Sequence, residues 1–161
     1  MAAKGDYPLP KFHFQVNFEG TDGKDMRLGF TEVSGLDFET EIIEYREGFD
    51  KRYTKGAQPG LKKWSHITCK RGTFQGDYQY YLEWNKTIHF QEGNKTGSLF
   101  RGTVTIKLLN DEHEPVIVWK LSNAWVSKTS STDLKADGNE VAIETMELVH
   151  EGLTIDTAVG V

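Results

Sequence analysis

The 161-residue sequence contains a single cysteine, Cys69, and only four prolines. One cysteine cannot form an internal disulfide, so a folded chain of this composition depends on a packed core. No apolar run approaches the roughly 20 residues that cross a bilayer. The first residues, MAAKGDYPLPKF, lack the apolar stretch of a secretory signal. We therefore expect a protein that is assembled in a reducing cytoplasm and has no direct membrane anchor.

Positive charge is also scarce, because 24 acidic residues outnumber 19 lysines and arginines and leave a net charge of -5. Binding to free nucleic acid requires a basic surface, so the charge argues against that class of partner. The length matches one domain of about 100–200 residues. With 37% hydrophobic and 12% aromatic residues, a single domain spanning 1–161 has enough apolar material for one core.

The motifs of common enzymes are missing. The segment EGNKTG lacks the order G-x-x-x-x-G-K-[ST] of a phosphate-binding loop, and Ser34 lies in EVSGL, outside a G-x-S-x-G elbow. Cys69 is flanked by Thr68 and Lys70 in a strand pattern. Nearby basic residues can lower a thiol pKa, but a lone strand cysteine is more typical of packing. The sequence predicts no catalysis and no cofactor.

Metal-ligand spacing is missing as well, since the five histidines are scattered along the chain. The segment DEHE at 111–114 fits either a metal site or a solvated acidic turn, and a turn tip with little enclosure favours the turn. Glu39, Glu41 and Glu44 form an acidic strand segment. Paired carboxylates serve acid–base chemistry, but without an inferable pocket a charged outer or lumen-facing surface is favoured.

What the sequence does contain is alternation. In KFHFQVNF, apolar side chains at every second position, Phe14, Val16 and Phe18 among them, predict a half-buried strand. Residues 103–110 and 116–125 predict a hairpin around the acidic turn, with Val104, Ile106 and Leu108 facing inward. Further strands are predicted at 26–33, 36–48, 63–72 and within 134–153.

One segment, DYQYYLEWNKTI at 77–88, has helical spacing of Tyr81, Leu82 and Ile88, with Asp77 placed to cap it. About seven or eight strands, one helix and no alternation of strands with helices predict a mainly β fold. We expect a small antiparallel β-barrel or sandwich of two packed sheets, with one flanking α-helix.

Residues 48–60, GFDKRYTKGAQPG, interrupt the strand pattern. The segment is polar and basic and contains three glycines and a proline. This composition predicts a long loop or extended arm.

The last strand pattern, in LKADGNEVAIETMELVHEGL, changes phase. Val141 and Ile143 share one face, whereas Met146 and Leu148 lie on the other. A strand that is apolar on both faces can bury one face in its own barrel and the other against an identical neighbour. Alternatively, a β-bulge near Glu144 would turn both sets toward one core.

Five segments together resemble the inner-tube proteins of contractile phage tails and of phage-tail-like contractile injection systems, more closely the latter. They run in the family's order from Tyr7 to about Ile155. The segments are YPLPKFHFQV, FTEVSGLDFETEIIEYREG, PGLKKWSHITCKRGTFQG, LLNDEHEPVIVWKLSNAW and STDLKADGNEVAIETMELVHEGL.

The resemblance implies the same barrel with a flanking helix, a fold that the type VI secretion tube protein shares. It implies rings of six subunits stacked into a hollow tube, with strands lining the lumen and the helix outside. Implied partners are the chain itself, a contractile sheath, baseplate and tape-measure or cap proteins, and cargo effector or DNA in the lumen. The particle, extracellular, membrane-attached or a virion, would be assembled in a bacterial cytoplasm.

In that family the loop between the third and fourth strands reaches the next ring, which here is the segment 48–60. We expect its basic residues to meet acidic ones on a neighbouring ring, and the last strand to contact a neighbour within the ring. The inter-ring candidates are Lys51, Arg52, Tyr53, Lys55, Glu39, Glu41 and Glu44; the intra-ring candidates are Met146, Leu148 and His150.

A ligand-binding β-barrel for carbohydrate or lipid is the alternative function. It would use exposed aromatic side chains, for which the sequence offers four tryptophans. The candidates are Trp64, Trp84, Trp119 and Trp125.

Overall fold

The computed structural model describes residues 8–19, 25–73 and 101–157. Within these ranges the chain forms ten β-strands and no helix. The predicted helix at 77–88 lies outside the described residues. The strands are β1 (Phe14–Glu19), β2 (Asp25–Leu28), β3 (Glu32–Ser34), β4 (Phe38–Tyr45), β5 (Gly56–Trp64), β6 (Ile67–Gly72), β7 (Gly102–Leu109), β8 (Pro115–Ser130), β9 (Ile143–Val149) and β10 (Gly152–Thr157).

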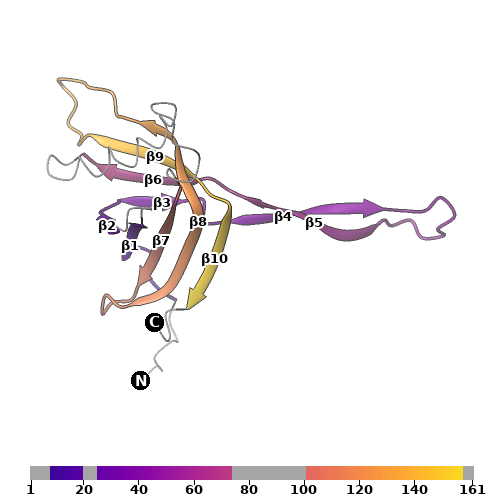
Figure 1. Cartoon of the computed structure of the whole chain (residues 1–161). Coiled ribbons are helices and arrows are strands. Elements are labelled where there is room, and N and C mark those ends of the chain that lie inside the picture. The colour runs from indigo at the N-terminus through magenta and orange to yellow at the C-terminus, as the bar shows by residue number, and fades with distance from the viewer. Residues whose placement is uncertain (1–7, 20–24, 74–100, 158–161) are drawn as a thin grey trace, which may run out of the picture.

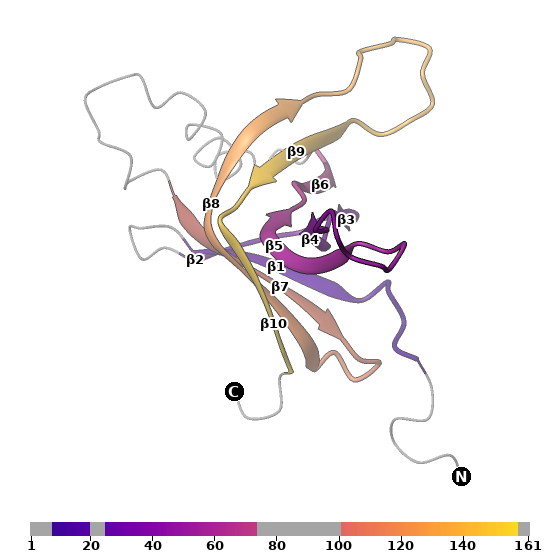
Figure 2. The same ribbon diagram turned by 90° about the vertical axis from the view of Figure 1, so that its right-hand side faces the viewer.

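Eight of these strands form the body of the molecule, which we call the barrel. Their order is β2-β1-β7-β8-β9-β6-β3, with β10 also paired to β8, and all pairings are antiparallel. The long strand β8 joins two sheets. Up to Ala124 it pairs with β7 and β10, and from Trp125 it pairs with β9. Figures 1 and 2 show how β8 curves between the two sheets.

The change of sheet occurs where Asn123 adopts a left-handed conformation, with φ of 51°. Asparagine tolerates this region better than most residues. The Asn123 side chain also donates a 2.9 Å hydrogen bond to Glu151, which pairs with Arg101. These contacts fix the corner at which β8 leaves one sheet for the other.

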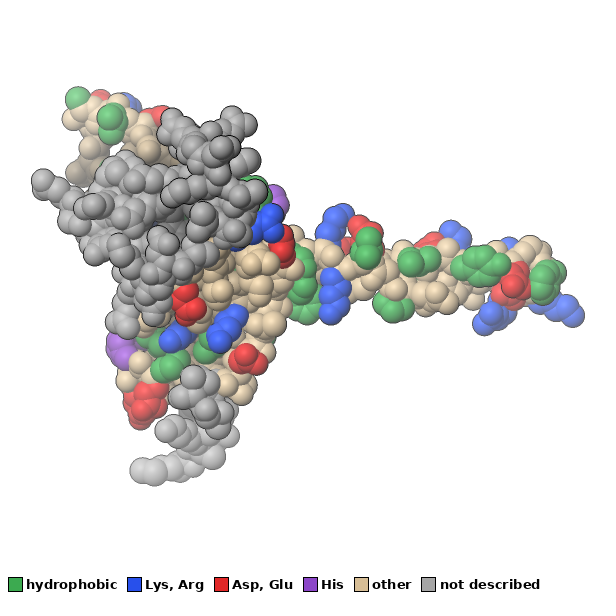
Figure 3. All heavy atoms as spheres, in the orientation of Figure 1, with side chains coloured by type: hydrophobic (Ala, Val, Ile, Leu, Met, Phe, Trp, Pro, Cys, Tyr) green, Lys and Arg blue, Asp and Glu red, His purple; other side chains and the backbone are tan. Residues whose placement is uncertain are grey.

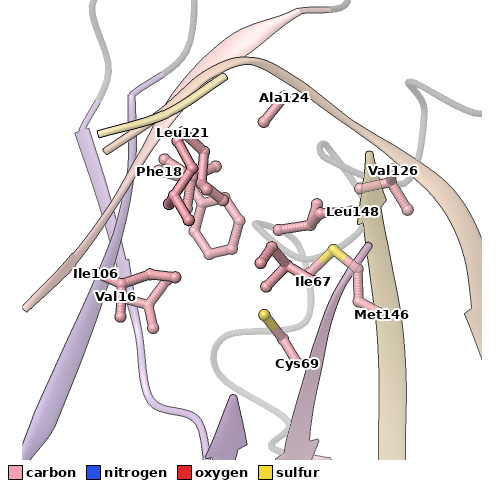
Figure 4. Close-up of a cluster of buried hydrophobic side chains, with 12 residues drawn as sticks. Val16, Phe18, Ile67, Cys69, Ile106, Leu121, Ala124, Val126, Met146 and Leu148 are labelled. Carbon is pink, nitrogen blue, oxygen red and sulfur yellow. The ribbon is translucent and has the colours of Figure 1, made fainter. Parts of the chain in front are cut away.

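The two sheets enclose one apolar core (Figure 4). The predicted inward positions of β1 and β7 are confirmed for Val16, Phe18, Val104 and Ile106, which are buried. Phe14 and Leu108 are only partly buried, and Phe12, which precedes β1, is 69% exposed. Twelve buried side chains make up the core cluster. They are Val16, Phe18, Ile67, Cys69, Val104, Ile106, Leu121, Ala124, Val126, Met146, Leu148 and Leu153.

Strand β9 contains the apolar residues whose phase changes in the sequence. Met146 and Leu148 are fully buried in the subunit's own core. The alternative of a β-bulge near Glu144 is wrong, because β9 pairs with β6 in unbroken register from Ile143 to Leu148. The irregularity lies instead in β8, between Val126 and Lys128.

The remaining two strands, β4 and β5, form a separate hairpin that projects from the barrel (Figure 1). We call residues 38–64 the arm. The sequence predicted an arm at 48–60, but its strands begin earlier and residues 56–60 belong to β5. The pattern at 63–72 is accordingly divided, with Trp64 ending the arm and Ile67 beginning a barrel strand.

Candidate assembly surface

The arm is a two-stranded hairpin whose pairing runs from Phe38 opposite Trp64 to Tyr45 opposite Gly56. Its register shifts between Thr40 and Ile42. The shift accommodates Pro59, which lacks a backbone donor and suits edge strands and bulges. Gly60 lies close to β4, since a Cβ there would be 3.0 Å from the Glu41 carbonyl oxygen. Loop-like residues therefore form a strand here.

The arm exposes large apolar side chains, which appear as green patches along it in Figure 3. Seven of the thirteen exposed large hydrophobic residues in the described chain lie on it. Tyr53 is fully exposed and Phe49 is 83% exposed, both at the tip. The other five are Phe38, Ile42, Ile43, Tyr45 and Leu61. An isolated hairpin is at best marginally stable in water, and clustered exposed apolar groups mark interaction sites.

The tip, residues 46–55, is ordered by its own hydrogen bonds. The Arg46 guanidinium donates to the backbone carbonyl oxygens of Asp50 and Arg52 at 3.0–3.1 Å. The Asp50 carboxylate accepts from the Arg52 amide and side chain. The Arg52 side-chain bond, followed by its backbone bond, lowers the pKa of Asp50 below its usual value. The tip is therefore a defined turn that presents Phe49 and Tyr53 outward.

The predicted inter-ring residues all lie on the arm, but several are paired within it. Lys55 contacts Glu44 at 3.0 Å, and Lys63 contacts Glu41 at 3.2 Å. All four are at least half exposed, so each pair contributes only about 0–1 kcal/mol. Lys51 and Glu39 make no ion pair among the described residues.

The arm leaves the barrel at a compact junction, which we call the arm root. Gly35 has φ of 89°, and a Cβ there would lie 2.1 Å from the His66 carbonyl oxygen. The rings of Phe38 and Trp64 pack with centroids 5.7 Å apart. The Trp64 ring lies 6.0 Å from that of His150. The root thus holds both arm strands against the end of β9.

Two of the predicted intra-ring contacts are wrong. Met146 and Leu148 have no exposed surface and cannot touch a neighbour. His150 is 6% exposed and belongs to the arm root. The outward face of β9 instead carries Ile143, 39% exposed, and the partly buried Val149, which is paired with Trp125 of β8.

Sequence reasoning named the tip's basic residues but did not name Phe49, Ile42, Ile43 or Leu61 as contacts. Their signal was available, because they are large apolar residues in a stretch that is otherwise polar. Such residues favour a surface that becomes covered on assembly.

Within the described ranges, no group of three or more potential metal ligands comes together. Burial raises the pKa of the Cys69 thiol to about 12, so it is inert as a nucleophile at neutral pH. In the same part of the chain, no helix has the length and apolar character needed to cross a bilayer.

The alternative of a ligand-binding barrel finds little support. The barrel interior is filled by the core cluster, and Trp119 packs against that cluster while Trp64 lies in the arm root. Trp125 is partly buried, and Trp84 lies outside the described residues.

Solved structures with the same fold come from contractile injection systems and from a type six secretion system. A chain from the extended sheath-tube complex of an extracellular contractile injection system, PVC, is 27% identical with TM-score 0.77, covering 96% of this chain and 95% of that one. A chain from the anti-feeding prophage cap is also 27% identical, with TM-score 0.75 and coverage of 98% and 97%. A type six secretion system protein at 13% identity and TM-score 0.53, with coverage of 89% and 82%, shares the fold.

No curated protein matches the chain. A family model does match, over residues 10–154, and its description is "T4-like virus tail tube protein gp19". The match covers β1 to β9, including the arm, and the first half of β10. This family is structural, in agreement with the prediction of no catalysis. The chain belongs to the T4-like tail tube protein family and is a tail tube subunit, not an enzyme.

Proposed function

We propose that copies of this chain assemble into rings of six that stack into a hollow tube, with the arm of each subunit docking on a subunit of the adjacent ring. The observation that best supports this proposal is the arm, whose seven large apolar side chains are exposed to solvent in a single subunit. In a tube built from one kind of subunit, the surface on which the arm docks belongs to a second copy of this chain. Burying these side chains on a second copy would stabilise the assembly by about 25 cal/mol for each Å² of apolar surface removed from water.

Open sheet edges support lateral assembly within a ring. Among the described strands, β10 pairs with β8 alone and β2 pairs with β1 alone. Within the described part of the chain, each therefore has one side along which its backbone donors and acceptors meet no strand. Ile155 on β10 is 53% exposed. Pairing of one subunit's β10 edge with a neighbour would satisfy these groups and cover Ile155.

Charge contributes to specificity more than to affinity. Lys51 at the tip and Glu39 near the root are the predicted contact residues that remain free of intramolecular ion pairs among the described residues. Tyr53 adds an aromatic anchor, a residue type common at binding hot spots. The other charged candidates keep their partners within the arm, so apolar contacts carry most of the docking.

The complexes that contain similar chains support a wider setting for the tube. Chains similar to this one occur in a sheath-tube complex and a cap complex of contractile injection systems. For this chain we infer an extracellular contractile particle, a sheath around the tube, and baseplate and cap proteins at its ends. Sheath contraction would drive the tube into a target envelope, and the bore would carry cargo.

Negative-stain electron microscopy of the purified protein, with sizing chromatography, tests the proposal. We expect rings or stacked tubes for the unmodified chain. The double variant Phe49→Ala with Tyr53→Ala is expected to keep a folded subunit and to lose stacking. Phe12→Ala is the matched control, because Phe12 is an exposed aromatic outside the arm, 69% accessible. Tubes of equal yield from the double variant would contradict arm docking.

A strictly monomeric unmodified protein, at high concentration and after addition of baseplate proteins as a nucleus, would contradict self-assembly altogether.

A further inference from the structure

His150 is a nearly buried imidazole at the point where the arm leaves the barrel. It follows the last residue of β9 and retains 6% of its surface. Figure 1 shows the end of β9 close to the base of the arm. An ionisable side chain in such a place needs a reason, because burial disfavours its charged form.

The contacts of His150 reach both arm strands. Its Nε2 lies 3.1 Å from the carbonyl oxygen of Ser65, so this nitrogen carries the proton and donates. Its ring packs near Trp64, the last residue of β5. Trp64 in turn contacts Phe38, the first residue of β4. The Ser65 amide donates to the Asp37 carbonyl oxygen at 3.4 Å, which closes the base of the hairpin.

Among the described residues, the ionisable groups around His150 offer it no free counter-charge. His66, from the segment after β5, has its Nδ1 2.7 Å from Glu147 of β9, so that carboxylate is already engaged. Glu151, the next residue, is held by Arg101 and Asn123. From the segment before β4, Asp37 contributes its backbone carbonyl oxygen to the root. A proton on His150 would therefore add a positive charge to a closed site next to the imidazole of His66.

Burial lowers the pKa of His150. The hydrogen bonds that its imidazole donates to the backbone of Ser65 and Gly152 raise the pKa, and nearby His66 lowers it further. A depressed pKa in the folded state means that the disordered root binds the proton more readily. The contribution of His150 to root stability is therefore present above its usual value, about 6.5, and is lost as the pH falls below it.

We propose that His150 is a positioning residue that fixes the direction of the arm while neutral and releases the arm root when protonated. The inference rests on the proposed docking of the arm. A released arm has no fixed direction, so its docking loses conformational entropy and the binding free energy becomes less favourable. Tube assembly should therefore fall on acidification, through the arm and not through the barrel core.

The direction of the arm can be measured directly by spin-label distances between Thr54→Cys at the tip and Lys128→Cys on β8. Buried Cys69 stays unlabelled because of its raised pKa. Labelled subunits are diluted into unlabelled ones, so that distances within one subunit dominate. We expect a narrow distance distribution near pH 8 and a broad one near pH 5, the range over which histidines titrate. A distribution that does not change with pH overturns the proposal.

Two variants separate positioning from general stability. H150Q keeps a side-chain donor for the Ser65 carbonyl and removes titration, so its distance distribution should not broaden on acidification. H113Q is the matched control, since His113 lies exposed in the β7–β8 turn, and it should broaden as the unmodified protein does. If H150Q does not fold, H150F keeps a ring against Trp64 and serves the same purpose. An acid response that persists in H150Q or H150F overturns the proposal.

Tube yield over the same pH range, counted by electron microscopy, distinguishes this inference from the proposed function. Tubes that form equally at both pH values, with a fixed arm, would overturn the role of His150 and leave arm docking intact. A pH-dependent arm in a protein that never forms tubes would contradict the proposed function and leave the positioning role standing.

Discussion

The barrel buries its large apolar side chains, whereas the arm exposes them to solvent. The barrel core holds twelve apolar side chains with 0–7% of their surface exposed. The arm displays seven large apolar side chains that are 54–101% exposed. Both are built from antiparallel strands, but among the ten described strands β4 and β5 pair only with each other. The fold of a subunit is therefore stabilised in one region, and its capacity to associate resides in another.

The largest expected effect comes from placing the same charge in the two regions. Leu148→Asp buries a carboxylate in the core and should cost more than about 4 kcal/mol of folding free energy. Leu61→Asp, at a position 79% exposed on the arm, should change it by less than about 0.5 kcal/mol. Thermal unfolding followed by circular dichroism measures both. A folded, soluble Leu148→Asp monomer would mean that β9 uses this face for a neighbour after all.

The second effect is expected at the arm root. Gly35→Ala forces a side chain into the left-handed region and against the His66 carbonyl oxygen, at a cost above about 3 kcal/mol. Gly29→Ala is the control, because a Cβ at Gly29 meets nothing within 4 Å. Denaturant unfolding gives the free-energy change. If the two variants were equally stable, the root would not be the rigid junction described above.

A smaller effect is expected from charge at the tip. Lys51→Glu should reduce tube yield at low salt by an amount equivalent to about 0–1 kcal/mol per contact, and the reduction should fade toward about 1 M salt. Lys128→Glu, an exposed lysine on the barrel strand β8, serves as the comparison. Light scattering of assembling tubes against salt provides the measurement. Equal responses of the two variants would remove Lys51 from the docking contact.

The smallest effect concerns Asp50. Arg52 lowers the pKa of this carboxyl, so the order of the tip is present above the usual aspartate value and is lost as the pH falls through the depressed one. The carboxyl carbon signal of Asp50 in NMR should titrate below about 3.9. Arg52→Gln should return the midpoint toward that value. A midpoint unaffected by Arg52→Gln would show that the pair does not order the tip.

The sequence allowed the mainly β class, the inward residues of β1 and β7, and the presence of an arm to be predicted. The phase of β9 was not predictable, because Glu144 is buried on the inward face opposite Arg71 of β6, itself 1% exposed. A period-two interpretation assigns a glutamate to the solvent side. The inward position of Arg71 depends on a pairing between β6 and β9 that no local pattern encodes.

The extent of the arm was underestimated for a related reason. Gly56, Pro59 and Gly60 are typical of loops, and local composition predicted one. In the hairpin, the register shift after Thr40 admits the proline, and close approach to β4 suits Gly60. The register shift and the close approach both depend on the partner strand. The ion pair of Glu44 with Lys55 also joins the two strands, so two residues predicted to contact another subunit are paired within the arm.

Cryo-electron microscopy of the assembled tube tests the central claim most directly, because it shows what covers the arm. The account predicts that Phe49 and Tyr53 are buried against a subunit of the adjacent ring, while Met146 and Leu148 remain in the core of their own subunit. A tube in which Phe49 and Tyr53 stay exposed to solvent would contradict it.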